Sequence, residues 1–74
     1  MTLKDVNPGQ VCVIEGIGKK SSLRKRIIDM GLTIGTIIEV RKLAPLGDPI
    51  EILIRGYHLS LRKAEAAEVF VRLV

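Results

Sequence analysis

Several residue types that carry chemistry are scarce or absent in this chain of 74 residues. It holds no tryptophan and a single cysteine, Cys12. With one cysteine, an intrachain disulfide and a cysteine-rich zinc site are both excluded. A single thiol fits a reducing compartment. No segment approaches the ~18–20 apolar residues that span a bilayer, and the N-terminus lacks the basic-then-apolar order of a signal peptide. We therefore expect a cytoplasmic protein with no transmembrane segment.

Catalytic signatures are missing as well. The serines Ser21, Ser22 and Ser60 stand in no recognisable nucleophile motif, and no paired carboxylates are placed to frame a cleft. The glycines fall singly in turns rather than together in a phosphate-binding loop. The sequence thus predicts no catalytic residue, and we expect a protein that is not an enzyme.

Aromatic side chains are limited to Tyr57 and Phe70. Both stand where the alternation of apolar residues predicts burial, which leaves no stacking platform for single-stranded bases. We expect no specific nucleic-acid binding, although clustered positive charge would support salt-sensitive, non-specific binding.

Aliphatic residues, by contrast, are abundant. Hydrophobic residues make up 47% of the sequence, enough for one domain over residues 1–74 with a modest core worth roughly 3–5 kcal/mol. Runs of β-branched residues between turn residues predict five short strands, which we place at 11–17, 37–43, 50–55, 57–62 and 69–74. Strands of this length joined by tight turns favour a small, mainly β, closed barrel, a form that removes most sheet edges.

One α-helix is predicted inside this β pattern, at about residues 22–30. Leu23, Ile27 and Met30 form a single apolar stripe along it, and Ser21 and Ser22 are potential N-caps. Shorter helical turns are predicted at 2–6 and at 63–68.

The chain reversals are assigned to glycine and proline. Gly31 stands where a left-handed residue would end the helix, and Leu32 could then contact Ile27 as in a Schellman motif. The other structural corners are assigned to Gly35, Gly47, Pro49 and Gly56.

Three short segments together carry a family resemblance. Residues 30–35 read MGLTIG, residues 46–50 read LGDPI and residues 56–62 read GYHLSLR. In this order and spacing they resemble the FeoA family, a likeness that extends over almost the whole chain. One departure is Ile34, which stands where many members of the family carry proline.

The resemblance implies a fold and a function. It implies an SH3-like barrel and an accessory or regulatory role in ferrous iron (Fe²⁺) transport, through protein–protein contact with the cytosolic, GTP-hydrolysing part of the FeoB permease. No diagnostic metal-ligand motif comes with it, so we expect no resident cofactor. Two alternatives stay open. One is the SH3-like domain of an iron-dependent, DtxR-type regulator that binds transition-metal ions, and the other is a basic small-barrel nucleic-acid binder.

A basic cluster is the first candidate contact surface. It holds five of the twelve positive charges, namely Lys19, Lys20, Arg24, Lys25 and Arg26. Three of these lie in the first turns of the predicted helix, where the macrodipole disfavours cations by roughly 0.3–1 kcal/mol each. The cluster is therefore either a solvated helix face or a surface selected to meet an acidic partner.

Leu46 is the second candidate contact, at the tip of the loop between Pro45 and Pro49. Its side chain either folds back on the barrel or is presented to a partner. A tip framed by prolines loses little further entropy on docking. Open sheet edges could also pair weakly between copies of the chain.

His58 and Cys12 are weak candidates for binding Fe²⁺ or another transition-metal ion. His58 is expected to be exposed, and sequence alone does not bring it near Cys12. Cys12 and Met30 more simply serve as core filler.

Overall fold

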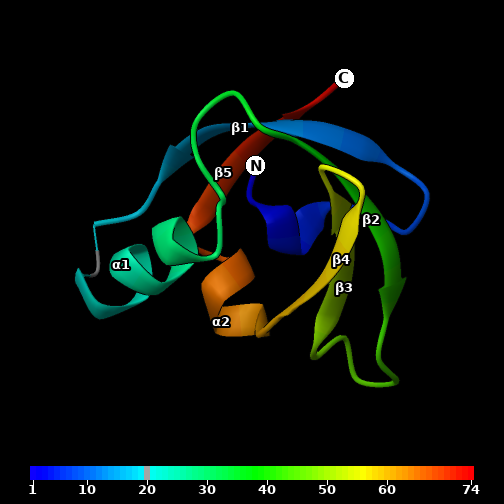
Figure 1. Ribbon diagram of the computed structural model, residues 1–74. Coiled ribbons are helices and arrows are strands. Elements are labelled where there is room, and N and C mark those ends of the chain that lie inside the picture. The colour runs from blue at the N-terminus through cyan, green and yellow to red at the C-terminus, as the bar shows by residue number, and fades with distance from the viewer. Residues whose placement is uncertain (20) are drawn as a thin grey trace.

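The computed structural model describes residues 1–19 and 21–74 and is mainly β, as predicted (Figure 1). Its five strands are β1 (Val11–Ile17), β2 (Ile37–Leu43), β3 (Ile50–Ile54), β4 (Tyr57–Leu61) and β5 (Val69–Leu73). The helices are a 3₁₀ turn, η1 (Leu3–Asp5), and two α-helices, α1 (Ser21–Asp29) and α2 (Lys63–Ala66). None of the helices in these described ranges has the length and hydropathy that a membrane span requires.

The strands form one antiparallel sheet in the order β4-β3-β2-β1-β5. The pairing register shifts in β1 between Ile14 and Gly16, and in β2 between Val40 and Lys42. Such bulges bend a strand and increase its twist, so the sheet curls around the core. Figure 1 shows η1 and α2 inside the curve of the sheet.

The predicted closure of the barrel is wrong in one respect. Strands β4 and β5 stand at opposite ends of the sheet order and do not pair with each other in the described part of the chain. The chain forms α2 between them, so a helical turn takes the place of the last strand contact. The edge of β5 is partly covered by the N-terminus, because the Val71 N–H donates to the Met1 carbonyl over 3.0 Å and Thr2 bridges to Phe70.

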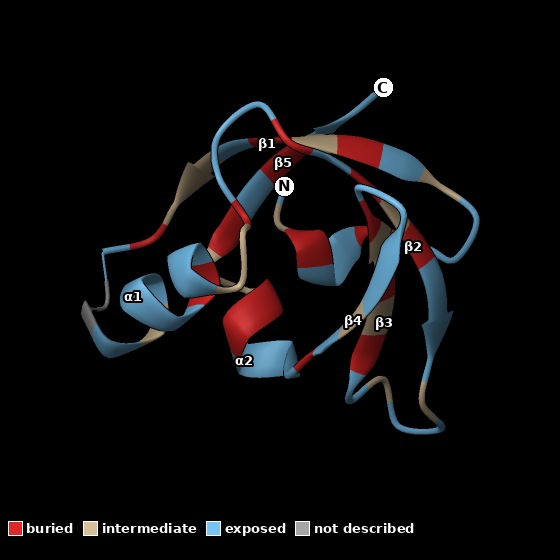
Figure 2. Cartoon of the chain, viewed as in Figure 1, coloured by how far each residue is buried: buried red, intermediate tan, exposed pale blue. Residues whose placement is uncertain are grey.

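The core is almost entirely aliphatic. In β3 the side chains of Ile50, Ile52 and Ile54 are buried, which confirms the predicted alternation, and Leu3 and Val6 are buried as well. Figure 2 shows buried positions along the strands and in the helical turns that the sheet surrounds. Side chains from every strand and from α1 and α2 complete it. This single cluster holds the curved sheet around the helical turns.

The end of α1 is a complete Schellman motif, as predicted. Gly31 has a φ of +91°. Its N–H donates to the Ile28 carbonyl over 2.9 Å, and the Leu32 N–H donates to the Ile27 carbonyl over 3.3 Å. Ile27 and Leu32 are fully buried. The helix begins at Ser21, one residue earlier than expected, so both predicted cap positions belong to the helix itself.

The other predicted corners are also present. Gly35 and Gly47 have φ values of +90° and +79°, and the Gly47 N–H donates to the Ala44 carbonyl over 2.7 Å. The Ala44 N–H in turn donates to the Pro49 carbonyl over 3.1 Å, which closes the base of the loop. Strand β3 ends at Ile54 rather than at residue 55.

A two-residue turn joins β3 to β4. Both of its residues have positive φ, +49° at Arg55 and +84° at Gly56, which is the type I′ geometry that matches the strand twist. Arg55 is therefore part of the turn and not of the strand.

The prediction that both aromatic side chains are buried is wrong. Tyr57 and Phe70 are 41% and 43% exposed. In β5 the core-facing positions belong to Val69 and Val71, so Phe70 between them points outward. Tyr57 follows the hairpin turn directly, and its hydroxyl reaches the Met30 carbonyl at 3.4 Å.

Candidate functional site

Two members of the predicted basic cluster fasten α1 to the rest of the molecule. The Arg24 Nη1 donates to the carbonyl of Ile17 at the end of β1 over 2.9 Å. The Arg26 Nε lies 2.6 Å from Oε2 of Glu65 in α2. Both residues are exposed, Arg26 with 67% of its side chain, so they combine a structural contact with a charged surface.

Glu65 is the one buried carboxylate among the described residues, with a side chain only 4% exposed. Its Oε1 accepts a hydrogen bond from the Arg62 N–H over 2.9 Å. This bond gives a partner to an N–H group at the start of α2 that has none within the helix. The role of Glu65 was not predicted. Its signal in the sequence is an acid three residues after Arg62, the N-cap of a short helical turn, which is the spacing of a capping box.

Two further basic residues of the cluster lie on the surface. Lys19 and Lys25 are exposed, and Lys25 lines a shallow hollow with Arg24, Ile28 and Asp29. Lys20, also predicted as a contact residue, lies outside the described residues.

Leu46 projects from the loop between β2 and β3 with 91% of its surface exposed. Of the two alternatives for this side chain, the folded-back plug is therefore wrong, and the side chain is exposed to solvent, as a contact with a partner would require. The loop also meets α2, because the Asp48 carboxylate accepts a hydrogen bond from the Lys63 N–H over 3.1 Å.

The two candidate metal ligands are not brought together. His58 is exposed on β4, where its Nδ1 lies 3.6 Å from Oε1 of Glu51. Cys12 is fully buried on β1, and strands β3 and β2 lie between β4 and β1 in the sheet order. Burial raises the pKa of the Cys12 thiol. Within residues 1–19 and 21–74, no three His, Cys, Asp or Glu side chains are grouped so as to hold a metal ion.

A surface that was not predicted from the sequence lies between α1 and the start of β2. Three isoleucines are conspicuously exposed there, Ile28 by 39%, Ile34 by 70% and Ile37 by 58%. Together with the half-buried Ile17 they form what we call the isoleucine track. Isolated exposed aliphatic residues are ordinary on a protein surface, but a contiguous set marks a candidate interaction site.

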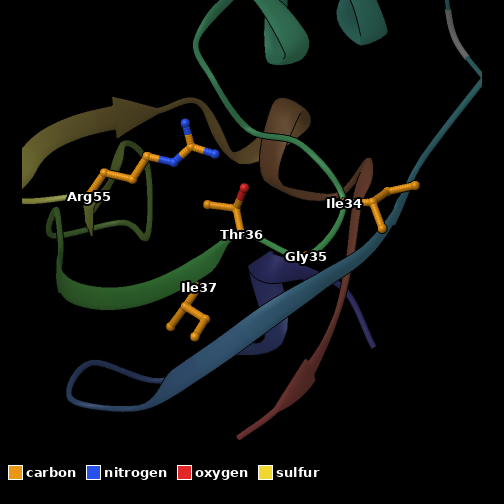
Figure 3. A pocket seen from close by; sticks show the side chains of 5 residues that line it. All are labelled: Ile34, Gly35, Thr36, Ile37 and Arg55. Carbon is orange, nitrogen blue, oxygen red and sulfur yellow. The ribbon is translucent and has the colours of Figure 1, made fainter.

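Two hollows run along the isoleucine track and share Ile34. The larger, of about 550 Å³, is lined by Ile34, Gly35, Thr36, Ile37 and Arg55 (Figure 3). The smaller, of about 340 Å³, is lined by Ile17, Arg24, Ile28, Thr33 and Ile34. Figure 3 shows Ile34 and Arg55 on opposite sides of Thr36.

The backbone explains why Ile34 faces outward. It is the second residue of a turn closed by the Thr36 N–H, which donates to the Thr33 carbonyl over 3.1 Å. The turn is tied to β1 on both sides of Ile14, whose carbonyl accepts from the Gly35 N–H over 2.8 Å and whose N–H donates to the Thr36 carbonyl over 3.0 Å. With its backbone held against the sheet, the turn presents the Ile34 side chain to solvent.

The sequence did contain a signal for this surface. Ile28 follows Ile27 directly, so it lies about 100° around the helix from the apolar stripe, and a helical wheel places it toward solvent. Ile34 precedes a turn glycine and has no strand partner. Neither isoleucine is part of the core, and apolar side chains that the core does not use indicate another role.

Comparison with known proteins gives consistent results. A model of the family described as FeoA domain matches residues 1–73. The chain is 38% identical, over all 74 of its residues, to a protein from Porphyromonas gingivalis (strain W83) in which Fe(2+) transport protein A is fused to the Fe(2+) transporter FeoB. The chain spans only 9% of the length of that fusion protein.

Solved structures agree on the fold. A FeoA-like protein from Clostridium acetobutylicum superposes with a TM-score of 0.94 at 40% identity, covering 100% of this chain and 86% of that one. FeoA from Stenotrophomonas maltophilia, described as an SH3 domain protein and solved with zinc, superposes with a TM-score of 0.84 at 22% identity. That likeness covers 97% of this chain and 89% of the other and shows the fold alone, which is SH3-like.

Proposed function

Because the chain belongs to the FeoA domain family, a family associated with Fe²⁺ transport, we propose that it is an accessory protein that binds the cytosolic part of a FeoB-type permease. The observation that carries the proposal is the fusion protein of Porphyromonas gingivalis, in which a segment 38% identical to this chain is joined covalently to the transporter. Joining two modules in one polypeptide raises their effective concentration, which is useful where the two parts must bind each other.

The mode of action that we propose is binding without bond chemistry. A ligand shifts a conformational equilibrium only by its difference in affinity for the two states. The chain would therefore favour one conformation of the permease by binding that conformation more tightly, while any GTP hydrolysis belongs to the permease. The proposal assigns the chain no catalytic residue and no resident cofactor, and it places the chain at the cytoplasmic side of the membrane.

Two measurements test this proposal together. In a strain that lacks the gene for this chain, uptake of radiolabelled Fe²⁺ should fall and should recover when the full chain is restored. In parallel, the affinity-tagged permease from the same genome, purified in detergent, should retain the chain, whereas a permease lacking its soluble domain should not. Normal uptake in the deletion strain, or equal retention by both forms of the permease, would overturn the proposal.

A further inference from the structure

We propose that the isoleucine track is the docking surface for an acidic segment of the protein partner, one that carries large apolar side chains flanked by Asp or Glu. This inference rests on the proposed function and names the surface through which it acts. The first argument is apolar area. Ile34 and Ile37 are more than half exposed, so a partner that covers them removes a large apolar area from water, which favours binding.

The second argument is continuity. The larger hollow shares Ile34 with the smaller one, and the smaller shares Arg24 and Ile28 with a third hollow on α1 of about 310 Å³. The three hollows therefore follow one another from the start of β2 to the middle of α1. A single segment of a partner could place successive apolar side chains in them, as anchors do in a hydrophobic groove.

The third argument is charge. Arg55 lines one end of this series of hollows, Arg24 its middle and Lys25 its other end, while Asp29 is the one acid among the described residues that line them. Apolar hollows with cations around them match a partner segment with apolar anchors and neighbouring carboxylates. Complementary charge of this kind guides the encounter and fixes the register of docking.

Arg55 strengthens the argument from charge. Its φ of +49° makes it the one described non-glycine residue with a positive φ. A type I′ turn favours Asn, Asp or Gly at this position, so turn geometry alone does not account for an arginine. A role for its positive charge at the mouth of the larger hollow does account for it.

The fourth argument is rigidity. The turn that presents Ile34 is held to β1 by two backbone hydrogen bonds, and Thr36 within it is only 6% exposed. Ile28 lies on a helix fixed by the Schellman motif and by the ion pair of Arg26 with Glu65. A surface that is already ordered loses little conformational entropy when a partner binds.

The test compares two exposed aliphatic side chains that lie on different surfaces. The soluble domain of the permease is titrated into the ¹⁵N-labelled full chain, and binding is also measured for Ile34→Asp and Leu46→Asp. Each variant puts a carboxylate in place of an exposed side chain on a turn, so only the position differs. We expect shifts centred on residues 17, 24, 28, 34, 37 and 55, and a loss of affinity of tenfold or more for Ile34→Asp but not for Leu46→Asp.

A second pair of variants tests the charge. Arg55→Asp keeps a residue that tolerates the left-handed turn and reverses the charge, while Lys63→Glu makes the same change in charge at the start of α2. We expect several-fold weaker binding for the first and little change for the second. The amide spectrum of each variant establishes that it is folded. If Ile34→Asp does not fold, Ile28→Glu replaces it, because glutamate is a good helix former.

The outcomes separate the two proposals. If the wild-type chain does not bind the soluble domain at all, the proposed function fails and this inference fails with it. If the chain binds but the shifts centre on Leu46, the proposed function stands and the isoleucine track is overturned. Shifts at the track that appear on raising the concentration of the chain alone, or on adding phosphatidylserine vesicles alone, would assign the surface to a second copy or to a membrane and would also overturn it.

Discussion

The two glycine-bearing corners at either end of β2 are held in different ways. The corner before β2, residues 31–36, is bonded to α1 through the Schellman motif and to β1 through Ile14, and Leu32 within it is fully buried. The corner after β2, residues 44–49, closes mainly on itself, through the bonds of Ala44 with Gly47 and with Pro49, and Leu46 at its tip is 91% exposed. The same ingredients, a leucine and a glycine, thus make an anchored corner at one end and a projecting loop at the other.

The difference shows that a local turn motif does not decide the role of its apolar residue. Leu32 is buried because the Schellman motif at the end of α1 places it in the core. Leu46 lies at the tip of a hairpin loop, where no described element covers it. The same substitution made at both corners therefore tests whether they are held differently.

The largest effect is expected for Leu32→Ala. Removing a fully buried leucine side chain costs about 2–5 kcal/mol through lost transfer energy and the cavity left behind. For a domain of this size, that is most of the roughly 3–5 kcal/mol available. Urea denaturation monitored by circular dichroism should show a protein that is partly unfolded in water, and a loss below 1 kcal/mol would mean that the first corner is less anchored than the structure indicates.

Glu65→Ala is expected to have the next largest effect. It removes the ion pair with Arg26 and the acceptor for the Arg62 N–H, for a loss of about 1.5–3 kcal/mol, since hydrogen bonds to charged groups lie in that range. The Arg26 side chain is 67% exposed, which favours the lower half of it. Amide shifts should spread along α1 to the first corner, and a double-mutant cycle with Arg26→Ala should show coupling between the two side chains. Purely additive effects would contradict a stabilising pair.

Gly31→Ala sharpens the comparison at the level of the backbone. A non-glycine residue in left-handed geometry costs about 1–2 kcal/mol, and both Gly31 and Gly47 have positive φ. A Cβ at Gly31 would also lie 3.1 Å from the Tyr57 hydroxyl, whereas nothing lies within 4 Å at Gly47. Chemical denaturation should therefore show a larger loss of unfolding free energy for Gly31→Ala than for Gly47→Ala. Equal losses would mean that the close approach to the Tyr57 hydroxyl costs nothing.

The smallest effect is expected for Leu46→Ala. An exposed side chain contributes little to folding, so the free energy of unfolding should change by less than about 0.5 kcal/mol. Thermal denaturation of Leu46→Ala and Leu32→Ala under the same conditions compares the two losses of stability. A loss comparable to that of Leu32 would mean that the Leu46 side chain packs against the barrel in solution.

Features governed by local rules were predictable from the sequence. The Schellman end of α1 depends on Gly31 and on the spacing of Ile27 and Leu32, and the alternation in β3 depends on side chains two residues apart. These patterns lie within a few residues of one another, and the structure confirms them.

Features that depend on distant partners were not predictable. Glu65 and Arg26 are separated by 39 positions, and nothing local indicates that they meet. The alternation of apolar residues predicts that Phe70 is buried, but the core-facing positions of β5 belong to Val69 and Val71. The isoleucine track was not predictable because its residues come from the end of β1, from α1, from the turn at residues 33–36 and from the start of β2, which only the fold brings together.

The single thiol of the chain makes the opening of this barrel measurable without denaturant. Cys12 is fully buried on β1, and burial raises its pKa, so the thiolate that alkylating reagents attack is scarce in the folded protein. Iodoacetamide should therefore modify Cys12 mainly in molecules whose sheet has transiently come apart. When reclosing is faster than alkylation, the modification rate follows the population of the open form, and this one native side chain would rank all the variants by stability under physiological conditions.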